Sequence, residues 1–154
     1  MSEIIIQKFG GTSLGSVERI DAVAEIIKKA SKKNKIAVVV SAMSGETNRL
    51  IDLANSFGNN PDKREFDALV STGETISSAL LSMALHSKGI KARSFSASQI
   101  AIRTTSSYSK AKILDVDAKK ILDVLENDTI PIITGFQGIT AVSYTHLTLP
   151  TSSW

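Results

Sequence analysis

The stretch Ile4-Ile5-Ile6-Gln7-Lys8-Phe9-Gly10-Gly11-Thr12-Ser13 decides the fold predicted for this chain. Its β-branched apolar start predicts a buried strand, its two glycines predict a turn, and Ser16 is a good N-cap for the helical pattern that follows. Glycines let backbone N–H groups approach an anion closely, and a helix N-terminus favours negative charge. The stretch therefore predicts a phosphate-binding turn, with Lys8 near the carboxyl end of the strand, where open α/β sheets bind ligands.

Strands and helices alternate along the rest of the chain. Further strands are predicted at residues 36–40, 92–95 and 129–134, and helices at residues 17–30, from residue 50, and at 117–125. The apolar stretch 66–85 predicts either two helices that meet or one long helix, and residues 100–112 predict a hairpin or a loop. Asp62 and Asp117 are expected to cap helices. This order predicts an α/β fold: a three-layer sandwich around a largely parallel sheet.

Three of the predicted strands end in polar turns that contain glycine. These turns cover residues 10–13, 41–47 and 135–138. Because the carboxyl ends of parallel strands meet at one edge of a sheet, we expect the three turns to converge on one site.

Composition narrows the classes of function. The 154 residues carry a net charge of +3, suit one domain or a piece of a larger one, and include no cysteine, which excludes disulfides and thiolate metal sites. The densest basic group, residues 28–35, is attributed to a helix C-terminus rather than to nucleic-acid binding. Neither His86 nor His146 resembles a metal ligand. With no visible signal peptide and no apolar run of about 20 residues, we predict a cytoplasmic protein without membrane or nucleic-acid partners.

Residues 141–154 differ in character from the preceding domain, which is predicted to span residues 1–140. They carry no charge when His146 is neutral, and they hold the only tryptophan of the chain. They closely resemble a translated transposon-end adapter from a DNA sequencing library, so we expect genuine coding sequence to end near Thr140. An ordinary disordered C-terminus is the alternative, and the underlying DNA would distinguish the two.

Four motifs and one further segment carry a family resemblance. They are Lys8-Phe9-Gly10-Gly11-Thr12-Ser13, Val40-Ser41-Ala42-Met43, Ser71-Thr72-Gly73-Glu74, Lys91-Ala92-Arg93-Ser94-Phe95 and Thr134-Gly135-Phe136-Gln137-Gly138. Together and in this order they resemble the N-terminal part of the aspartate kinase catalytic domain, within the amino acid kinase family. The resemblance extends from Ile4 to about Thr140.

The resemblance implies a reaction, its cofactors and an assembly. Such enzymes use ATP with Mg²⁺ to phosphorylate the side-chain carboxylate of L-aspartate, which gives 4-phospho-L-aspartate for lysine, threonine and methionine biosynthesis. The ligands implied are therefore ATP, Mg²⁺ and L-aspartate. The full-length protein is expected to be a homo-oligomer.

The resemblance also assigns roles to residues of this chain. Lys8 is the cation on the transferring phosphoryl group, Ser41 and Thr47 hold the aspartate, and Glu74 pairs with its α-ammonium. Gly10, Gly11, Thr12 and Ser13 lie beside the ATP phosphates. Plainer readings stay open: Lys8 could be a solvated lysine, Ser41 and Thr47 could be helix caps, and Glu74 could be a solvated helix residue.

The chain also departs from the family pattern. After the Gly-Phe-Gln-Gly turn the family continues to a Gly-Arg-Gly-Gly-Ser-Asp segment, then to the strands that hold adenine and ribose, and then to regulatory domains. None of these follows here, so the sequence predicts an inactive fragment with a truncated sheet. Alternatives are another amino acid kinase, acting on glutamate, acetylglutamate, carbamate or a nucleoside monophosphate, or a non-catalytic module that binds a ligand or a subunit.

Overall fold

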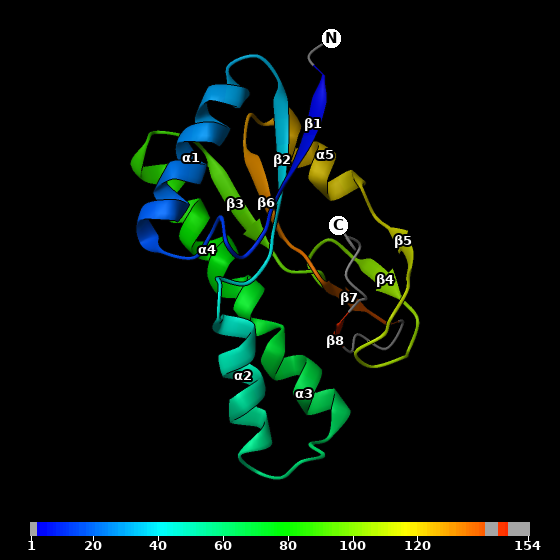
Figure 1. Ribbon diagram of the computed structural model, residues 1–154. Coiled ribbons are helices and arrows are strands. Elements are labelled where there is room, and N and C mark those ends of the chain that lie inside the picture. The colour runs from blue at the N-terminus through cyan, green and yellow to red at the C-terminus, as the bar shows by residue number, and fades with distance from the viewer. Residues whose placement is uncertain (1–2, 141–144, 148–154) are drawn as a thin grey trace.

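Sheet A is the centre of the molecule, and its four strands run parallel in the order β1-β2-β6-β3 (Figure 1). The computed structural model describes residues 3–140 and 145–147. The strands of sheet A are β1 (Ile4–Phe9), β2 (Lys35–Val40), β3 (Ala92–Phe95) and β6 (Ile130–Thr134). All four lie where the sequence predicts strands. Strands β1, β2 and β6 carry β-branched runs, which favour the extended conformation, whereas β3 contains no β-branched residue.

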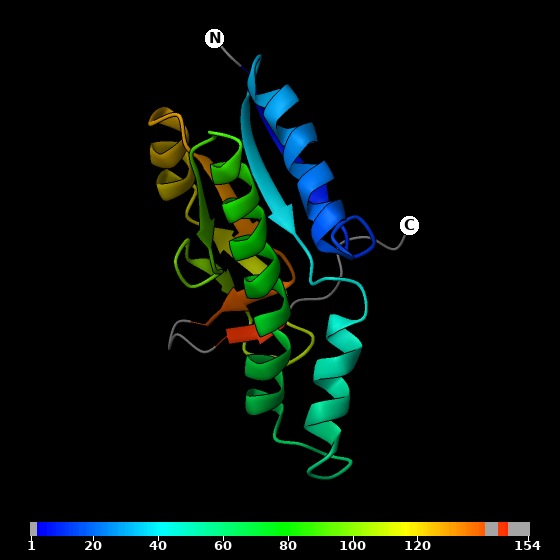
Figure 2. The same ribbon diagram turned by 90° about the vertical axis from the view of Figure 1, so that its left-hand side faces the viewer.

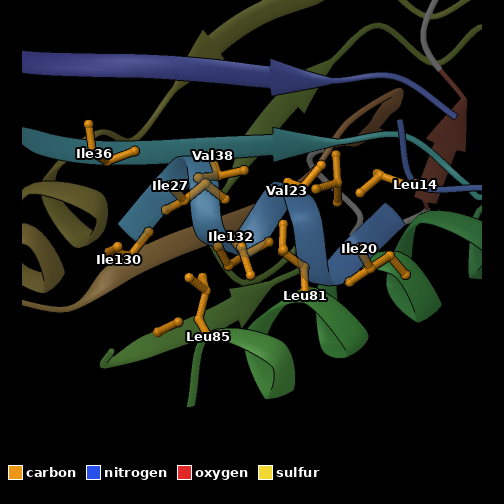
Figure 3. Close-up of a cluster of buried hydrophobic side chains, with 13 residues drawn as sticks. Leu14, Ile20, Val23, Ile27, Ile36, Val38, Leu81, Leu85, Ile130 and Ile132 are labelled. Atoms are coloured by element: carbon orange, nitrogen blue, oxygen red, sulfur yellow. The ribbon is translucent and has the colours of Figure 1, made fainter. Parts of the chain in front are cut away.

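Two helices cover one face of sheet A. Helix α1 (Val17–Ser31) begins after Ser16, whose hydroxyl accepts the N–H of Arg19 at 3.3 Å, as predicted for an N-cap. Helix α4 (Thr72–Ser87) packs beside α1. Figure 3 shows how side chains of both helices meet those of β2 and β6 in the main core; its labelled residues are Leu14, Ile20, Val23, Ile27, Ile36, Val38, Leu81, Leu85, Ile130 and Ile132.

Helix α5 (Lys119–Glu126) covers part of the opposite face, which completes the three layers of the predicted α/β fold. Its Ile121 and Val124 pack on Phe95 and Ile133 of the sheet. The predicted cap is wrong by one residue, because the N-cap position belongs to Ala118, which has no side-chain oxygen. The carboxylate of Asp117 still accepts the N–H of Lys119 at 3.0 Å, so it satisfies one free donor of the first turn.

The helices α2 (Glu46–Asn55) and α3 (Lys63–Val70) form an arm that projects beyond sheet A (Figures 1 and 2). Asp62 caps α3 as predicted, accepting the N–H of Glu65 at 3.0 Å. Of the two alternatives for residues 66–85, the structure has two helices that meet at Ser71. Taken together, Lys63–Ser87 is long and apolar enough to cross a membrane, but half of its most apolar window is buried inside the molecule. Core helices of soluble proteins have the same properties.

A second sheet, sheet B, lies beyond the carboxyl ends of sheet A. It contains β4 (Ile102–Thr104), β5 (Ile113–Val116), β7 (Gln137–Ile139) and β8 (Thr145–Leu147), in the order β5-β4-β7-β8. The antiparallel pair β4–β5 shows that residues 100–112 belong to a hairpin rather than a simple loop. The predicted turn at residues 135–138 is wrong in its second half, because β7 begins at Gln137. Gly138 fits there because a Cβ would overlap the side chain of Thr104 on the neighbouring strand.

Strand β8 falls within residues 141–154, for which the sequence predicts a non-native origin. Leu147 of β8 is buried against Leu50 of α2 and Val70 of α3, in the helical arm. The remaining parts, 141–144 and 148–154, lie outside the described residues. The origin of this segment stays a prediction, although its described residues pair with β7.

The prediction that β1 is buried is wrong. Strand β1 stands at one end of the order of sheet A, and its side chains alternate between the two faces. Ile5 and Phe9 face the core beneath α1, whereas Ile4 and Ile6 are 46% and 71% exposed. Helix α5 contacts β2 and β6, so the face of β1 that carries Ile6 has no helix over it among the described residues.

Candidate active site

The candidate site is a cavity of about 390 Å³ at the carboxyl ends of β1 and β2. Three segments line it: the turn after β1, the turn after β2 with the start of α2, and the junction of α3 and α4. Phe136, from the turn after β6, lines it as well. The lining residues are Gly11, Thr12, Ser41, Ala42, Met43, Ser44, Gly45, Thr47, Val70, Glu74 and Phe136. The structure thus brings together five of the residues singled out in the sequence.

Gly11 joins the first two turns. Its carbonyl accepts the N–H groups of Leu14 at 3.2 Å and Ser44 at 3.1 Å. A Cβ at Gly11 would lie 2.8 Å from the carbonyl oxygen of Ala42, closer than side-chain carbons pack, so this position requires glycine. At Gly10, by contrast, nothing lies within 4 Å of the position that a Cβ would take. The backbone at Gly10 is therefore open to a ligand.

Three of the predicted site residues lie outside the cavity wall. Lys8 is exposed on β1, paired in register with Val39 and adjacent to Phe9, whose carbonyl accepts the N–H of Ser41 at 3.1 Å. Gly10 and Ser13 form the outer part of the first turn, where the N–H of Ser13 donates to the carbonyl of Gly10 at 3.1 Å. All three residues lie at the same end of sheet A as the cavity, but none of them lines it.

Ser41 lines the cavity from the turn after β2, and Thr47 lines it from the first turn of α2, which begins at Glu46 rather than at the expected residue 50. The N-cap of α2 is Gly45, with φ of 82° in the left-handed region that favours glycine. Neither hydroxyl is therefore the cap of α2, which removes the plainer reading of both residues as N-caps. Both side chains border the cavity, where a hydroxyl can donate to a carboxylate or a phosphoryl oxygen.

Glu74 is the only carboxylate among the cavity-lining residues, and it is only 5% exposed. Its Oε1 accepts the N–H of Ala42 at 3.3 Å, whereas its Oε2 is buried with no hydrogen-bond partner among the described groups. Gly73 allows this approach, because a Cβ there would lie 2.8 Å from the Cβ of Ala42. The reading of Glu74 as a solvated helix residue is therefore wrong.

Burial sets the electrostatics of Glu74. Desolvation raises the pKa of its carboxyl to about 6, and this effect is partly offset by its own backbone N–H, by the N–H of Ala42 and by the nearby polar side chain of Gln137. A buried carboxylate with an unpartnered oxygen is costly unless a cation or donor reaches it. The site therefore favours a ligand that presents a positive or hydrogen-bond-donating group to Glu74.

The turn at residues 135–138 was expected at the site, but the sequence assigns no individual role to two of its residues, Phe136 and Gln137. Phe136 lines the cavity from a left-handed conformation with φ of 64°, which is uncommon for a residue with a side chain. Gln137 is buried behind the start of α4 and hydrogen-bonds to Thr134 and Ser71. The one available signal was that an aromatic and an amide residue stand between two glycines after an apolar strand. That pattern indicates a turn but not the direction of its side chains.

Comparisons with known proteins identify the family and the fold. Residues 3–148 match the model of the amino acid kinase family. A curated relative, the aspartate kinase of Pseudomonas putida, is 50% identical over 137 residues; the match covers 88% of this chain and 33% of the relative. The chain thus spans about a third of the length of such relatives.

Solved structures show the same fold. The aspartate kinase of Synechocystis matches with a TM-score of 0.77 and 38% identity, over 98% of this chain and 24% of that one. Escherichia coli aspartokinase III, solved in complex with aspartate and ADP, matches with a TM-score of 0.84 and 21% identity, over 94% of this chain and 43% of that one. From its sheet, its site and the extent of the family match, this chain belongs to the amino acid kinase family.

Proposed function

We propose that this chain is the N-terminal part of an ATP-dependent aspartate kinase, which transfers a phosphoryl group from ATP to the side-chain carboxylate of L-aspartate. The observation that carries the proposal is the buried, half-partnered carboxylate of Glu74, facing a cavity lined by the hydroxyl residues Ser41 and Thr47. An amino acid presents an ammonium and a carboxylate, which complement these groups. Relatives named aspartate kinase at about 50% identity support the choice of acceptor.

Each residue has a physical task in this proposal. Glu74 binds the α-ammonium, which supplies the cation that its unpartnered oxygen lacks. Ser41 and Thr47 orient a carboxylate by donating hydrogen bonds. In the transfer, one P–O bond to ADP breaks and one P–O bond to the aspartate carboxylate forms, with no proton exchanged, so catalysis rests on positioning and on charge stabilisation. Lys8 provides the positive charge near the transferring group.

The turn at residues 10–13 fits a nucleotide phosphate. Its backbone is open at Gly10. At Gly11 the backbone lies so close to the second turn that a Cβ would not fit. For Mg²⁺ the fit is different, because the described residues contain no cluster of three His, Asp or Glu side chains that could hold a metal. Mg²⁺ is often bound through substrate phosphates and water, so any such ion here would arrive with the nucleotide, and no step is assigned to it.

Release of ADP in the presence of L-aspartate tests this proposal. The full-length enzyme that contains this chain should release ADP from ATP when L-aspartate is present. The rate of ADP release should fall at least a hundredfold in its Lys8→Ala variant. L-Glutamate, N-acetylglutamate, carbamate and nucleoside monophosphates serve as competing acceptors. A preference for one of these would overturn the choice of aspartate, and no turnover with any acceptor would favour a non-catalytic binding module.

The 154-residue polypeptide by itself is expected to show no turnover. It spans a third of the length of its relatives, and in the proposal the nucleotide is held mainly by the remaining two thirds. Turnover above the Lys8→Ala control in this polypeptide would contradict that expectation. A cytoplasmic location and a homo-oligomeric full-length enzyme remain predictions alongside this one.

A further inference from the structure

A buried hydrogen-bond network connects β6 and β7 with the start of α4. The hydroxyl of Thr134 donates to Oε1 of Gln137 at 3.2 Å, and Nε2 of Gln137 donates to the carbonyl oxygen of Ser71 at 2.6 Å. Gln137 is 4% exposed and Thr134 is 1% exposed. Because a donor meets the amide oxygen and an acceptor meets the amide nitrogen, the orientation of the Gln137 side chain is fixed.

The network ends at the residue that immediately precedes α4. Ser71 is the N-cap of α4, and Glu74 lies in the first turn of that helix. Ser71 makes no side-chain capping bond to α4, because its hydroxyl donates to the carbonyl of Ala68 instead. The bond from Gln137 to the Ser71 carbonyl is therefore a direct tie between this first turn and sheet B.

We propose that Gln137 is a positioning residue for Glu74: it holds the first turn of α4 against β7, so that the carboxylate of Glu74 faces the cavity. This inference rests on the proposed function, in which Glu74 receives the ammonium of the acceptor. Gln137 is not among the residues that line the cavity, so it acts through Glu74 rather than on the ligand.

Gln137 also affects the charge of Glu74, because it favours the ionised carboxylate that the proposal requires. Its polar side chain lowers the pKa of Glu74, which opposes the larger effect of burial. The short bond of the amide goes to Ser71, so its effect on Glu74 is smaller than that of the backbone N–H groups. No ion pair among the described residues involves Glu74, and Glu46, which approaches Gly73, is itself paired with Arg49 at 2.7 Å.

Titration of the Glu74 carboxyl by carbon-13 NMR in the 154-residue chain tests the inference. In Gln137→Met, we expect the pKa of Glu74 to rise above about 6, because the amide no longer favours the ionised form. Thr134→Val keeps the amide but frees its oxygen end, and a smaller rise is expected. Gln7→Met is the matched control, since Gln7 lies in β1 with its side-chain oxygen unpartnered, and it should leave the pKa unchanged.

An unchanged Glu74 pKa in folded Gln137→Met overturns the inference. If that variant does not fold, an unchanged pKa in Thr134→Val overturns it instead. In the longer enzyme, KM for aspartate should rise about threefold at pH 6.5 in Gln137→Met and recover by about pH 8.5, with kcat little changed. If the pKa shifts but no variant phosphorylates aspartate, the proposed function fails while the positioning role stands.

Discussion

The carboxyl of Glu74 makes the fold less stable above about pH 6. Its pKa rises from the ordinary 4.5 to about 6 because folding removes the charged form from water. The folded state therefore binds this proton more tightly than the unfolded state. The associated stability is fully present below about pH 4.5 and is lost as the pH rises through about 6, and the difference corresponds to about 2 kcal/mol.

Glu74→Gln should therefore stabilise the chain at neutral pH. The amide oxygen can still accept the N–H of Ala42, and no charge is buried. We expect a gain of about 1–2 kcal/mol in the free energy of unfolding at pH 7.5 and almost none at pH 4. Urea unfolding followed by circular dichroism at both pH values measures it.

Glu126→Gln is the control for this measurement, because Glu126 is an exposed carboxylate at the end of α5. It should change stability little at either pH. Equal effects of Glu74→Gln at pH 4 and pH 7.5 would contradict the burial argument.

Some residues of the site could be predicted from the neighbouring sequence and others could not. Gly11 could be identified because two successive glycines follow an apolar strand, and Glu74 because a carboxylate is unusual in an apolar helix. The direction of Phe136 and the burial of Gln137 depend on how β7 meets α4, which are far apart in the sequence. No local pattern contains that contact.

Strands and helices were predictable where their hydrophobic pattern was long enough. Strands β1, β2 and β6 have apolar runs, and helix α1 has an apolar stripe that matches its period. Sheet B has strands of only three or four residues, and its two hairpins are joined by a single pairing between distant segments, Arg103 of β4 with Ile139 of β7. Elements this short are defined by their partners rather than by their own sequence.

Helix α3 is tied to sheet B through one buried carboxylate. Asp67 is fully buried and accepts the N–H of Ser109 at 2.9 Å, the hydroxyl of Ser109 at 2.7 Å and the N–H of Leu147 at 3.0 Å. Ser109 has φ of 58°, a left-handed backbone that is costly for serine unless its surroundings hold it. The ring of His146 lies beside the carboxylate, with Nδ1 at 3.9 Å from Oδ2.

Asp67→Ala should destabilise the chain by about 2–4 kcal/mol. The substitution leaves the backbone N–H groups of Ser109 and Leu147 without an acceptor in the interior. It also removes the contacts that hold Ser109 in its left-handed conformation. Chemical denaturation gives the loss, and hydrogen exchange at the amides of Ser109 and Leu147 shows where it arises.

Asp52→Ala is the matched control for Asp67→Ala. Asp52 is an exposed aspartate on the neighbouring helix α2, so its loss should stay within about 0.5 kcal/mol. If both variants lose the same stability, Asp67 does not tie α3 to sheet B.

The layered α/β architecture was predictable for the molecule, but the order of its strands was not. Alternation of strands and helices implies a parallel sheet with helices on both faces. Which strand stands at the edge depends on pairings between distant segments, and this is why β1 was expected to be buried. The strongest apolar run of the N-terminus in fact forms an edge with one exposed face.

Ile6→Lys should reduce self-association of the 154-residue chain. Ile6 is 71% exposed on an edge strand, and such edges pair readily with other chains unless a charge is present. We expect the concentration at which the chain associates to rise severalfold, as measured by sedimentation velocity over a range of concentrations. Ile26→Lys is the control, because Ile26 is 52% exposed on α1, away from any strand edge, and equal effects of the two variants would contradict an edge-specific mechanism.

The position of β6 has a consequence for the order of events during synthesis. In sheet A, β6 lies between β2 and β3, although both precede it in the chain by many residues. On the ribosome, β1 and β2 can pair as soon as they emerge, but β3 has no neighbour until residues 130–134 appear. Docking of β6 then closes two long loops at once, one from β2 and one from β3. This step is slow because closing long loops costs chain entropy before the new contacts repay it. Until then a nascent chain exposes the apolar flanks of β2 and β3, and this interval is when a chaperone would be most needed.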